Sequence, residues 1–259
     1  MENIFDLTGK VVLVMGGSGN LGTAEVDALA SFGATVLSVH LHEEGLVETR
    51  ENVIHIDADF SSREEHLAIF DRVAKEYGRI DVLINNAAYG GGSGGKGLAL
   101  EIENFDDESW AGGIEGNLGL TFRSMRAAIP LMKENGGSIV NIASMYGVVS
   151  PDPGIYGNSG SNSPVTYGVS KAGVLQLTRY GAAHLAKYNI RVNAITPGPF
   201  PNEKTLSNKE FSAKLADKTM LKRVGTSKEL GGAIVLLASD ASTFMTGSNV
   251  TVDGGWTAW

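Results

Sequence analysis

The chain has 259 residues, 42% of them hydrophobic and 19% charged, and a formal net charge of −8 at pH 7. This composition is typical of a soluble globular protein and excludes a disordered one, and no apolar run approaches the ~18 residues that span a bilayer. The acidic balance disfavours a nucleic-acid partner, because phosphate backbones select basic surfaces.

Cysteine is absent from the sequence, which excludes disulfides and thiolate metal sites. The N-terminal residues show no basic stretch followed by an apolar one, so we expect no secretion signal and a cytoplasmic location. Asp, Glu and His never cluster at metal-ligand spacing, so we expect no catalytic metal. Because the sequence shows neither a repeat nor a linker, residues 1–259 are expected to form one domain.

A strand, a glycine-rich loop and a helix are predicted in succession near the N-terminus. Residues 10–15 form a short apolar run, residues 16–22 read Gly-Gly-Ser-Gly-Asn-Leu-Gly, and a helical pattern covers residues 24–32. The loop matches the pattern G-x-G-x-x-G at Gly17, Gly19 and Gly22. Glycines let the backbone approach a pyrophosphate, and the following helix offers free N–H groups. This order predicts a dinucleotide site, with a purely structural turn as the alternative.

The end of the second predicted strand, residues 34–41, bears on the choice of cofactor. An acidic residue there would hold the ribose 2′-hydroxyl of NAD, and an arginine would accommodate the 2′-phosphate of NADP. The sequence instead has His40 and His42, with Glu43 and Glu44 just beyond. The cofactor therefore stays open between NAD and NADP, with a slight preference for NAD because no arginine or lysine is present at this strand end.

Strands and helices continue to alternate along the rest of the chain. Further strands are predicted at residues 53–56, 80–84, 137–143, 190–195 and 249–252, and helices at residues 63–77, 110–132 and 228–238, with another helix around Tyr167. This alternation predicts an α/β fold with a doubly wound parallel sheet. The glycine-rich residues 90–97 follow a strand end and are predicted to form either a mobile lid or a plain surface loop.

The stretch from Ser144 to Lys171 holds a candidate acid/base pair. Tyr167 and Lys171 are four positions apart, so on a helix they share one face. A lysine cation beside a phenol is expected to lower the pKa of the phenol, which could then exchange a proton with an alcohol or carbonyl. By itself the pair is also common on solvated helix faces. Asn117, inside a predicted helix, is mildly unfavourable there, which indicates another task for its amide.

Taken together, these motifs resemble those of the short-chain dehydrogenase/reductase family over nearly the whole chain. The motifs are the glycine loop, Asn85-Asn86-Ala87-Ala88, Asn117, Ser144, Tyr167-x-x-x-Lys171, Pro197-Gly198 and Val252-Asp253-Gly254-Gly255. The resemblance implies a single Rossmann-type αβα sandwich of about seven strands in the order 3-2-1-4-5-6-7. It also implies NAD or NADP as cofactor and a homotetramer or homodimer.

The resemblance also assigns roles to individual residues. Tyr167 would be the general acid/base, Lys171 would lower its pKa and bind the nicotinamide ribose, Ser144 would hydrogen-bond the reacting oxygen, and Asn117 would hold a water of a proton relay. The remaining expected cofactor contacts are Gly16, Ser18, Gly19, Asn20, Leu21, Gly22, His40, Asp59, Phe60, Asn86, Ala87, Ala88, Pro197 and Gly198.

The sequence departs from the family pattern in three places. Asn20 replaces a glycine of the loop, and asparagine is a suitable substitute because it tolerates a left-handed backbone conformation. Ala88 replaces the glycine of the family pattern N-N-A-G. The largest departure is the spacing of 23 positions between Ser144 and Tyr167, which implies an insertion at about residues 150–164. This polar insertion is predicted to recognise a polyhydroxylated substrate, with a rigid rim that makes no substrate contact as the alternative.

Candidate substrate contacts are assigned on both sides of the site. They are Met145, Tyr156, Asn158 and Phe200, the last at the start of a substrate-loop excursion at about residues 198–224. At the C-terminus, Trp256 and Trp259 are expected to pack at a subunit contact, and packing on their own chain is the competing interpretation.

The sequence therefore predicts an oxidoreductase that moves hydride between a nicotinamide and a secondary alcohol or ketone. The preferred substrate is a sugar, polyol or sugar acid. A 3-oxoacyl thioester reductase is the alternative within enzymes. A nucleotide-sensing Rossmann protein without turnover is the alternative of another class, and the complete set of Asn117, Ser144, Tyr167 and Lys171 argues against it.

Overall fold

Seven parallel strands form one sheet in the order β3-β2-β1-β4-β5-β6-β7 in the computed structural model, which confirms the predicted order. The structure describes residues 3–41, 50–89, 101–157 and 162–259. The strands are β1 Val11–Met15, β2 Thr35–His40, β3 Val53–Asp57, β4 Val82–Asn85, β5 Gly137–Ile142, β6 Ile190–Pro197 and β7 Asn249–Val252. Strands β1 to β3 are added toward one edge of the sheet and β4 to β7 toward the other. The order therefore switches between β1 and β4, and open α/β sheets bind ligands at such a switch point.

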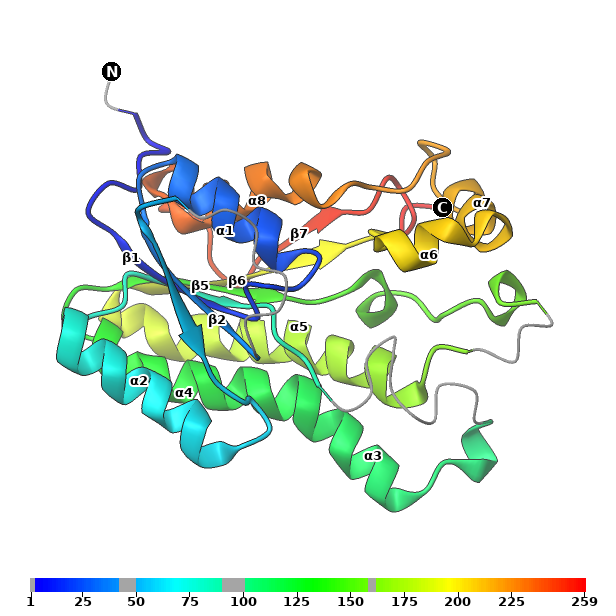
Figure 1. Ribbon diagram of the computed structural model, residues 1–259, viewed down its shortest axis with the longest axis horizontal. Helices are drawn as coiled ribbons and strands as arrows, with labels where there is room; N and C mark the ends of the chain where they lie inside the picture. The colour runs from blue at the N-terminus through cyan, green and yellow to red at the C-terminus, as the bar shows by residue number, and fades with distance from the viewer. Residues whose placement is uncertain (1–2, 42–49, 90–100, 158–161) are drawn as a thin grey trace.

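Helices cover both faces of the sheet (Figure 1). On one face lie α1 Gly22–Ser31 and α8 Gly231–Ala238, and on the other lie α2 Arg63–Tyr77, α4 Leu120–Met132 and α5 Val165–Leu185. The remaining helices, α3 Asp107–Ile114, α6 Glu203–Ser207 and α7 Lys209–Asp217, extend toward the carboxyl ends of the strands. No helix among these described ranges is long and apolar enough to cross a membrane.

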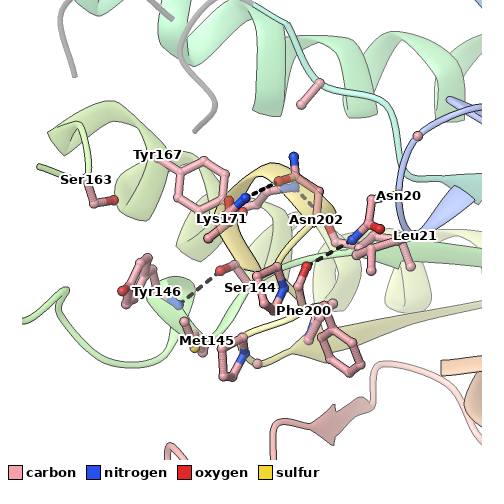
Figure 2. Close-up of a pocket in the computed structure, with 18 of the residues that line it drawn as sticks. Asn20, Leu21, Ser144, Met145, Tyr146, Ser163, Tyr167, Lys171, Phe200 and Asn202 are labelled. Carbon is pink, nitrogen blue, oxygen red and sulfur yellow. Dashed lines mark hydrogen bonds between the residues drawn. The ribbon is translucent and has the colours of Figure 1, made fainter. Parts of the chain in front are cut away.

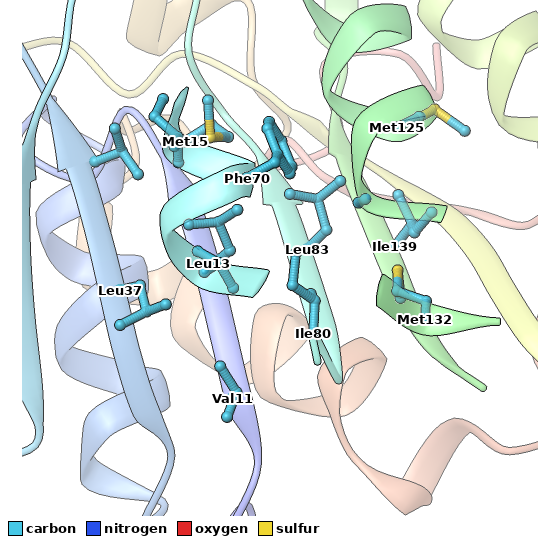
Figure 3. Close-up of a cluster of buried hydrophobic side chains, with 14 of the residues drawn as sticks. Val11, Leu13, Met15, Leu37, Phe70, Ile80, Leu83, Met125, Met132 and Ile139 are labelled. Carbon is cyan, nitrogen blue, oxygen red and sulfur yellow. The ribbon is translucent and has the colours of Figure 1, made fainter. Parts of the chain in front are cut away.

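The side chains of β1 show how the sequence builds two cores. Its five residues are all buried, and their side chains alternate between the faces of the sheet. Val11, Leu13 and Met15 point toward α2 and α4 (Figure 3), whereas Val12 and Val14 pack under α1 and α8. An uninterrupted apolar run is therefore the signature of a strand with helices on both faces.

The predicted helix at residues 110–132 is wrong at its start and in its continuity. The helix begins at Asp107, because the side chain of Asp106 accepts a hydrogen bond from the Ser109 N–H at 2.7 Å and caps the first turn. A π-helical turn, Glu115–Gly119, then separates α3 from α4. Such turns insert one residue into a helix and are frequent at functional sites. The other predicted elements differ from the structure mainly at their ends.

Several predicted features lie outside the described residues. They are His42, Glu43, Glu44, Asn158 and the glycine-rich residues 90–97. Within the ranges that the structure does describe, no group of three or more His, Cys, Asp or Glu side chains is arranged to hold a metal ion.

Candidate active site

A cavity of about 1480 Å³ opens at the carboxyl edge of the sheet. Its lining comes from the ends of β1, β2, β4, β5 and β6, together with the first turns of α5 and the α6–α7 segment. Ligand pockets usually measure roughly 300–1,000 Å³, so this one has room for a dinucleotide and a second molecule side by side. Figure 2 shows the central part, where Tyr167 and Lys171 from α5 lie beside Ser144, which follows β5.

The glycine loop is shaped by close backbone contacts. Gly16 has φ +86°, and a Cβ there would lie 2.9 Å from the Cα of Ala87, so only glycine fits between β1 and β4. A Cβ at Gly22 would lie 2.1 Å from the Gly16 carbonyl oxygen. Gly19 is different, because its Cβ position meets no atom closer than 3.5 Å. Gly16 and Gly22 therefore close the turn, and Gly19 leaves space on the cavity side.

The predicted cofactor residues come together around this loop. Gly22 packs within the turn and does not line the cavity, whereas all the others do: Gly16, Ser18, Gly19, Asn20, Leu21, His40, Asp59, Phe60, Asn86, Ala87, Ala88, Tyr167, Lys171, Pro197 and Gly198. The side-chain amide of Asn86 donates to the Gly16 carbonyl at 2.9 Å and fixes the loop against the end of β4. The start of α1 and the open face at Gly19 fit a pyrophosphate, so the chain's residues fit a nicotinamide dinucleotide.

His40 ends β2 and reaches the cavity with a constrained ring. Its Nε2 lies 3.0 Å from Nδ1 of His55 on β3, and one of the two nitrogens donates to the other. His40 is buried, and its Nδ1 has no hydrogen-bond partner among the described residues. The ring therefore keeps one unused polar atom at the place where the ribose of a dinucleotide would lie.

Ser144 and Tyr167 place two hydroxyls at the centre of the cavity. Both side chains line the cavity, and Ser144 Oγ accepts a hydrogen bond from the Tyr146 N–H at 3.2 Å. Burial raises the pKa of Tyr167 above its ordinary value, while the nearby Ser144 hydroxyl acts in the opposite direction. The sequence predicted that Lys171 lowers the pKa of Tyr167. Among the groups of the protein itself, burial has the largest effect, and it raises this pKa.

The side chain of Lys171 lies beside the Tyr167 ring, and its ammonium points toward the end of β5. Its Nζ donates to the Ile142 carbonyl at 2.8 Å and lies 5.7 Å from the centroid of the Tyr167 ring. Burial lowers the pKa of Lys171 to about 8, and the carboxyl of Glu25 acts against this shift. One of three N–H donors is used by Ile142, so the others can reach a ligand.

Glu25, in the first turn of α1, is a feature that sequence reasoning missed. Its exposure is 0%, and neither carboxyl oxygen has a hydrogen-bond partner among the described residues. Burial raises the pKa of Glu25 to about 8, and the positive charge of Lys171 opposes the rise. The sequence signal was present, because a glutamate occupies an inward-facing position between the glycine loop and the apolar residues Val26 and Leu29.

Asn117 lies in the π-helical turn and does not line the cavity itself. It is 1% exposed, and its amide nitrogen donates to the Gly113 carbonyl at 3.0 Å. Its Oδ1 is buried without a partner among the described residues. Because a buried carbonyl oxygen is costly to leave unpaired, this atom is suited to hold a water.

Two walls enclose the cavity beyond Ser144. One is the insertion, which brings Tyr156, and the other is the α6–α7 segment that follows Phe200. The rings of Tyr156 and Phe211 approach with centroids 5.5 Å apart, which joins the walls. Met145, Tyr156 and Phe200 all line the cavity, and their contact with a substrate stays a prediction. The sequence did not single out other lining residues, among them Tyr146, Ser163, Asn202, Asn208, Glu210 and Lys214.

A small apolar cluster holds these walls in place. Met145, Ile155, Leu215 and Trp256 are buried together, so the insertion, α7 and the C-terminus share one contact. Trp256 is 7% exposed and packs on its own chain, so the expectation of a subunit contact is wrong for this residue. Trp259 is largely exposed, its Nε1 donates to the Lys218 carbonyl at 3.1 Å, and a subunit contact for it stays a prediction.

Asn20 connects the glycine loop to the cavity wall that begins at Phe200. Its amide nitrogen donates to the Phe200 carbonyl at 3.0 Å (Figure 2). We expect Asn20→Ala to raise the KM of the substrate that binds beyond Ser144 about fivefold, since one hydrogen bond contributes roughly 1 kcal/mol. The KM of the cofactor should change less.

Steady-state kinetics with each substrate varied in turn measures this split. Thr23→Val is the matched control, because the Thr23 hydroxyl contacts carbonyls of the loop alone, those of Gly19 and Asn20. An equal rise in this KM for the Thr23 variant would show that the contact between Asn20 and Phe200 is not the cause.

Known proteins resemble the chain over nearly its whole length. Residues 17–257 match a family model described as enoyl-(acyl carrier protein) reductase. The 2-dehydro-3-deoxy-D-gluconate 5-dehydrogenase of Escherichia coli K12 is 35% identical over 266 residues, covering 98% of each chain. A short chain dehydrogenase from Leptospira borgpetersenii, solved with bound NAD+, is 31% identical with a TM-score of 0.84, covering 99% of this chain and 96% of that one.

A second solved structure adds the other nicotinamide cofactor. The gluconate 5-dehydrogenase from Burkholderia cenocepacia, in complex with NADP and tartrate, is 26% identical with a TM-score of 0.83 and covers 99% of this chain and 98% of its own. The similar proteins therefore include structures with either dinucleotide.

Proposed function

Because the chain belongs to the short-chain dehydrogenase/reductase family, we propose that it is an NAD(P)-dependent dehydrogenase of a polyhydroxylated secondary alcohol, namely a sugar, polyol or sugar acid. One observation supports this substrate class above the others, which is the polar lining of the cavity beyond Ser144 and Tyr167. The polar side chains there are Tyr156, Asn162, Ser163, Asn202, Thr205, Asn208, Glu210 and Lys214. Hydroxyl and amide groups of this kind can bond the several hydroxyls of such a substrate.

The proposed roles follow from the positions of the side chains. A nicotinamide dinucleotide held by the glycine loop and Lys171 would supply the acceptor of the hydride from the carbinol carbon, and its donor in the reverse direction. Ser144 and Tyr167 present their hydroxyls to the same oxygen of the substrate, and Tyr167 takes its proton during oxidation. Lys171 lies beside the Tyr167 ring and has N–H donors for the ribose. Asn117 Oδ1 holds the water through which the proton leaves.

For the cofactor, the surroundings of His40 support NAD. A 2′-phosphate needs a cation, yet the described residues that line this part of the cavity include His40, Leu41, Asp59 and Phe60 and no arginine or lysine. The carboxylate of Asp59, which lines the same part of the cavity, disfavours a phosphate there. We also propose that the enzyme is cytoplasmic and forms a homotetramer or homodimer.

A substrate panel tests the proposal. The purified protein is assayed with D-glucitol, D-gluconate and cyclohexanol in the presence of NAD or NADP, and with acetoacetyl-coenzyme A in the reducing direction. We expect turnover of the polyhydroxylated compounds and a kcat/KM at least about tenfold higher for NAD, a difference of about 1.4 kcal/mol. Exclusive reduction of the thioester would support the 3-oxoacyl reductase alternative, and the absence of turnover would contradict the enzyme assignment.

A further inference from the structure

The α7 wall of the cavity carries a cation whose positive charge no role described so far uses. Lys214 lines the same cavity as Ser144 and Tyr167, and its side chain is 37% exposed. Apart from Lys171, it is the only lysine or arginine among the described residues that line this cavity. We propose that Lys214 binds a carboxylate of the substrate, so that the natural substrate is a hydroxy acid or oxo acid. This inference rests on the proposed function and narrows it.

The position of Lys214 relative to the catalytic hydroxyls is fixed by its neighbours. Leu215, the next residue, is buried against Met145, which directly follows Ser144. On the opposite wall, the Nζ of Lys214 lies against the backbone of the insertion, 3.0 Å from the point where a Cβ of Gly157 would stand. The ammonium therefore lies between the two walls, on the substrate side of the cavity.

A carboxylate of the protein already shows that this ammonium can hold such a group. Glu210 lies one helical turn before Lys214, and its Oε1 is 2.9 Å from Nζ. The Glu210 side chain is 81% exposed, and an exposed pair at this spacing contributes little to stability. A substrate carboxylate, deeper in the cavity and better shielded from water, can therefore replace Glu210 as the partner of Lys214.

The walls themselves are held together by contacts that a bound acid would not disturb. Lys218 forms an ion pair with Asp152 of the insertion, and Ile155 is buried in the cluster with Leu215 and Trp256. Asp152 and Lys218 do not line the cavity, so their ion pair joins the insertion to α7 without occupying the space in front of Lys214. A neutral polyol can form hydrogen bonds with the Lys214 ammonium but no ion pair.

The test compares matched acid and alcohol substrates. D-Gluconate and D-glucitol have the same six-carbon chain and differ at one end by a carboxylate. Wild-type enzyme is expected to favour gluconate by at least tenfold in kcat/KM. Lys214→Met keeps the apolar stem and removes the charge, so it should raise the KM for gluconate at least tenfold, change kcat by less than threefold, and leave both constants for glucitol unchanged.

Lys209→Met is the control, because it removes an exposed lysine of the same helix, α7, that does not line the cavity. It should leave the preference for gluconate intact. The inference is overturned if wild-type enzyme oxidises glucitol as well as gluconate, or if Lys214→Met retains the preference. Either result leaves the proposed function standing, whereas a lack of turnover with every alcohol, cyclohexanol included, would contradict the proposed function itself.

Discussion

Replacing Tyr167 with phenylalanine is expected to lower kcat by about 1000-fold, because the variant loses the hydroxyl that we propose takes the proton from the alcohol. The ring stays in place beside Lys171 and Ser144, so the shape of the cavity is kept. Binding of the reduced nicotinamide, measured by its fluorescence, should change by less than about threefold, which separates a lost proton transfer from a lost cofactor site.

Tyr180→Phe is the matched control for this substitution. Tyr180 lies on the same helix, α5, and is largely exposed to solvent. Its loss of a phenolic hydroxyl should leave kcat unchanged. Because burial raises the pKa of Tyr167, we also expect the oxidation rate of the wild-type enzyme to increase with pH. Activity of Tyr167→Phe within tenfold of wild type would show that another group accepts the proton.

The second large effect concerns stability and its dependence on pH. The buried Glu25 has a folded-state pKa of about 8, above the ordinary value of 4.5, so its contribution is complete below pH 4.5 and is lost as pH rises toward 8. One pKa unit corresponds to about 1.4 kcal/mol, so we expect the wild-type free energy of unfolding to fall by about 3 kcal/mol between pH 5 and pH 8 from this group.

Glu25→Gln should remove this slope, since glutamine does not titrate. Urea unfolding of both proteins at several pH values, followed by far-UV circular dichroism, measures the difference. Glu76→Gln, which removes a partly exposed carboxyl from α2, controls for the loss of one acidic residue. Parallel curves for wild type and Glu25→Gln from pH 5 to pH 8 would contradict the assignment of the slope to Glu25.

Above pH 8 the sign reverses, because the pKa of Lys171 is lowered to about 8 from 10.5. The unfolded chain then binds the extra proton, and stability from this group rises with pH up to about 10.5. The two buried groups therefore act in different pH ranges, which allows them to be separated by the same experiment.

The strands of the sheet and the position of the glycine loop could be predicted from the sequence because they depend on local patterns of residues. Continuous apolar runs such as Val11–Met15 specify strands covered on both faces, and the glycine loop can adopt its turn only between a strand and a helix. The carboxyl ends of parallel strands then gather at one edge, which brought Ser144 and the glycine loop together as expected.

Features that depend on distant contacts could not be predicted in this way. The polar contact of His40 with His55 joins two strands, and the hydrogen bond of Asn20 with Phe200 spans most of the chain. The expected effect of Lys171 on Tyr167 failed for a related reason. Sequence spacing gives the proximity of the two groups, whereas the pKa of Tyr167 is dominated by burial, which requires all surrounding atoms.

The apolar cluster of Met145, Ile155, Leu215 and Trp256 has a consequence for changing the substrate range of this enzyme. It joins three segments that contribute no strand to the sheet: the insertion, α7 and the C-terminal residues. Grafting any one of them from a relative would leave mismatched surfaces against the other two. Cavities in the cluster would then lower the free energy of unfolding. The three segments would therefore have to be replaced together to change the substrate range. The dinucleotide-binding half of the chain could then remain unchanged.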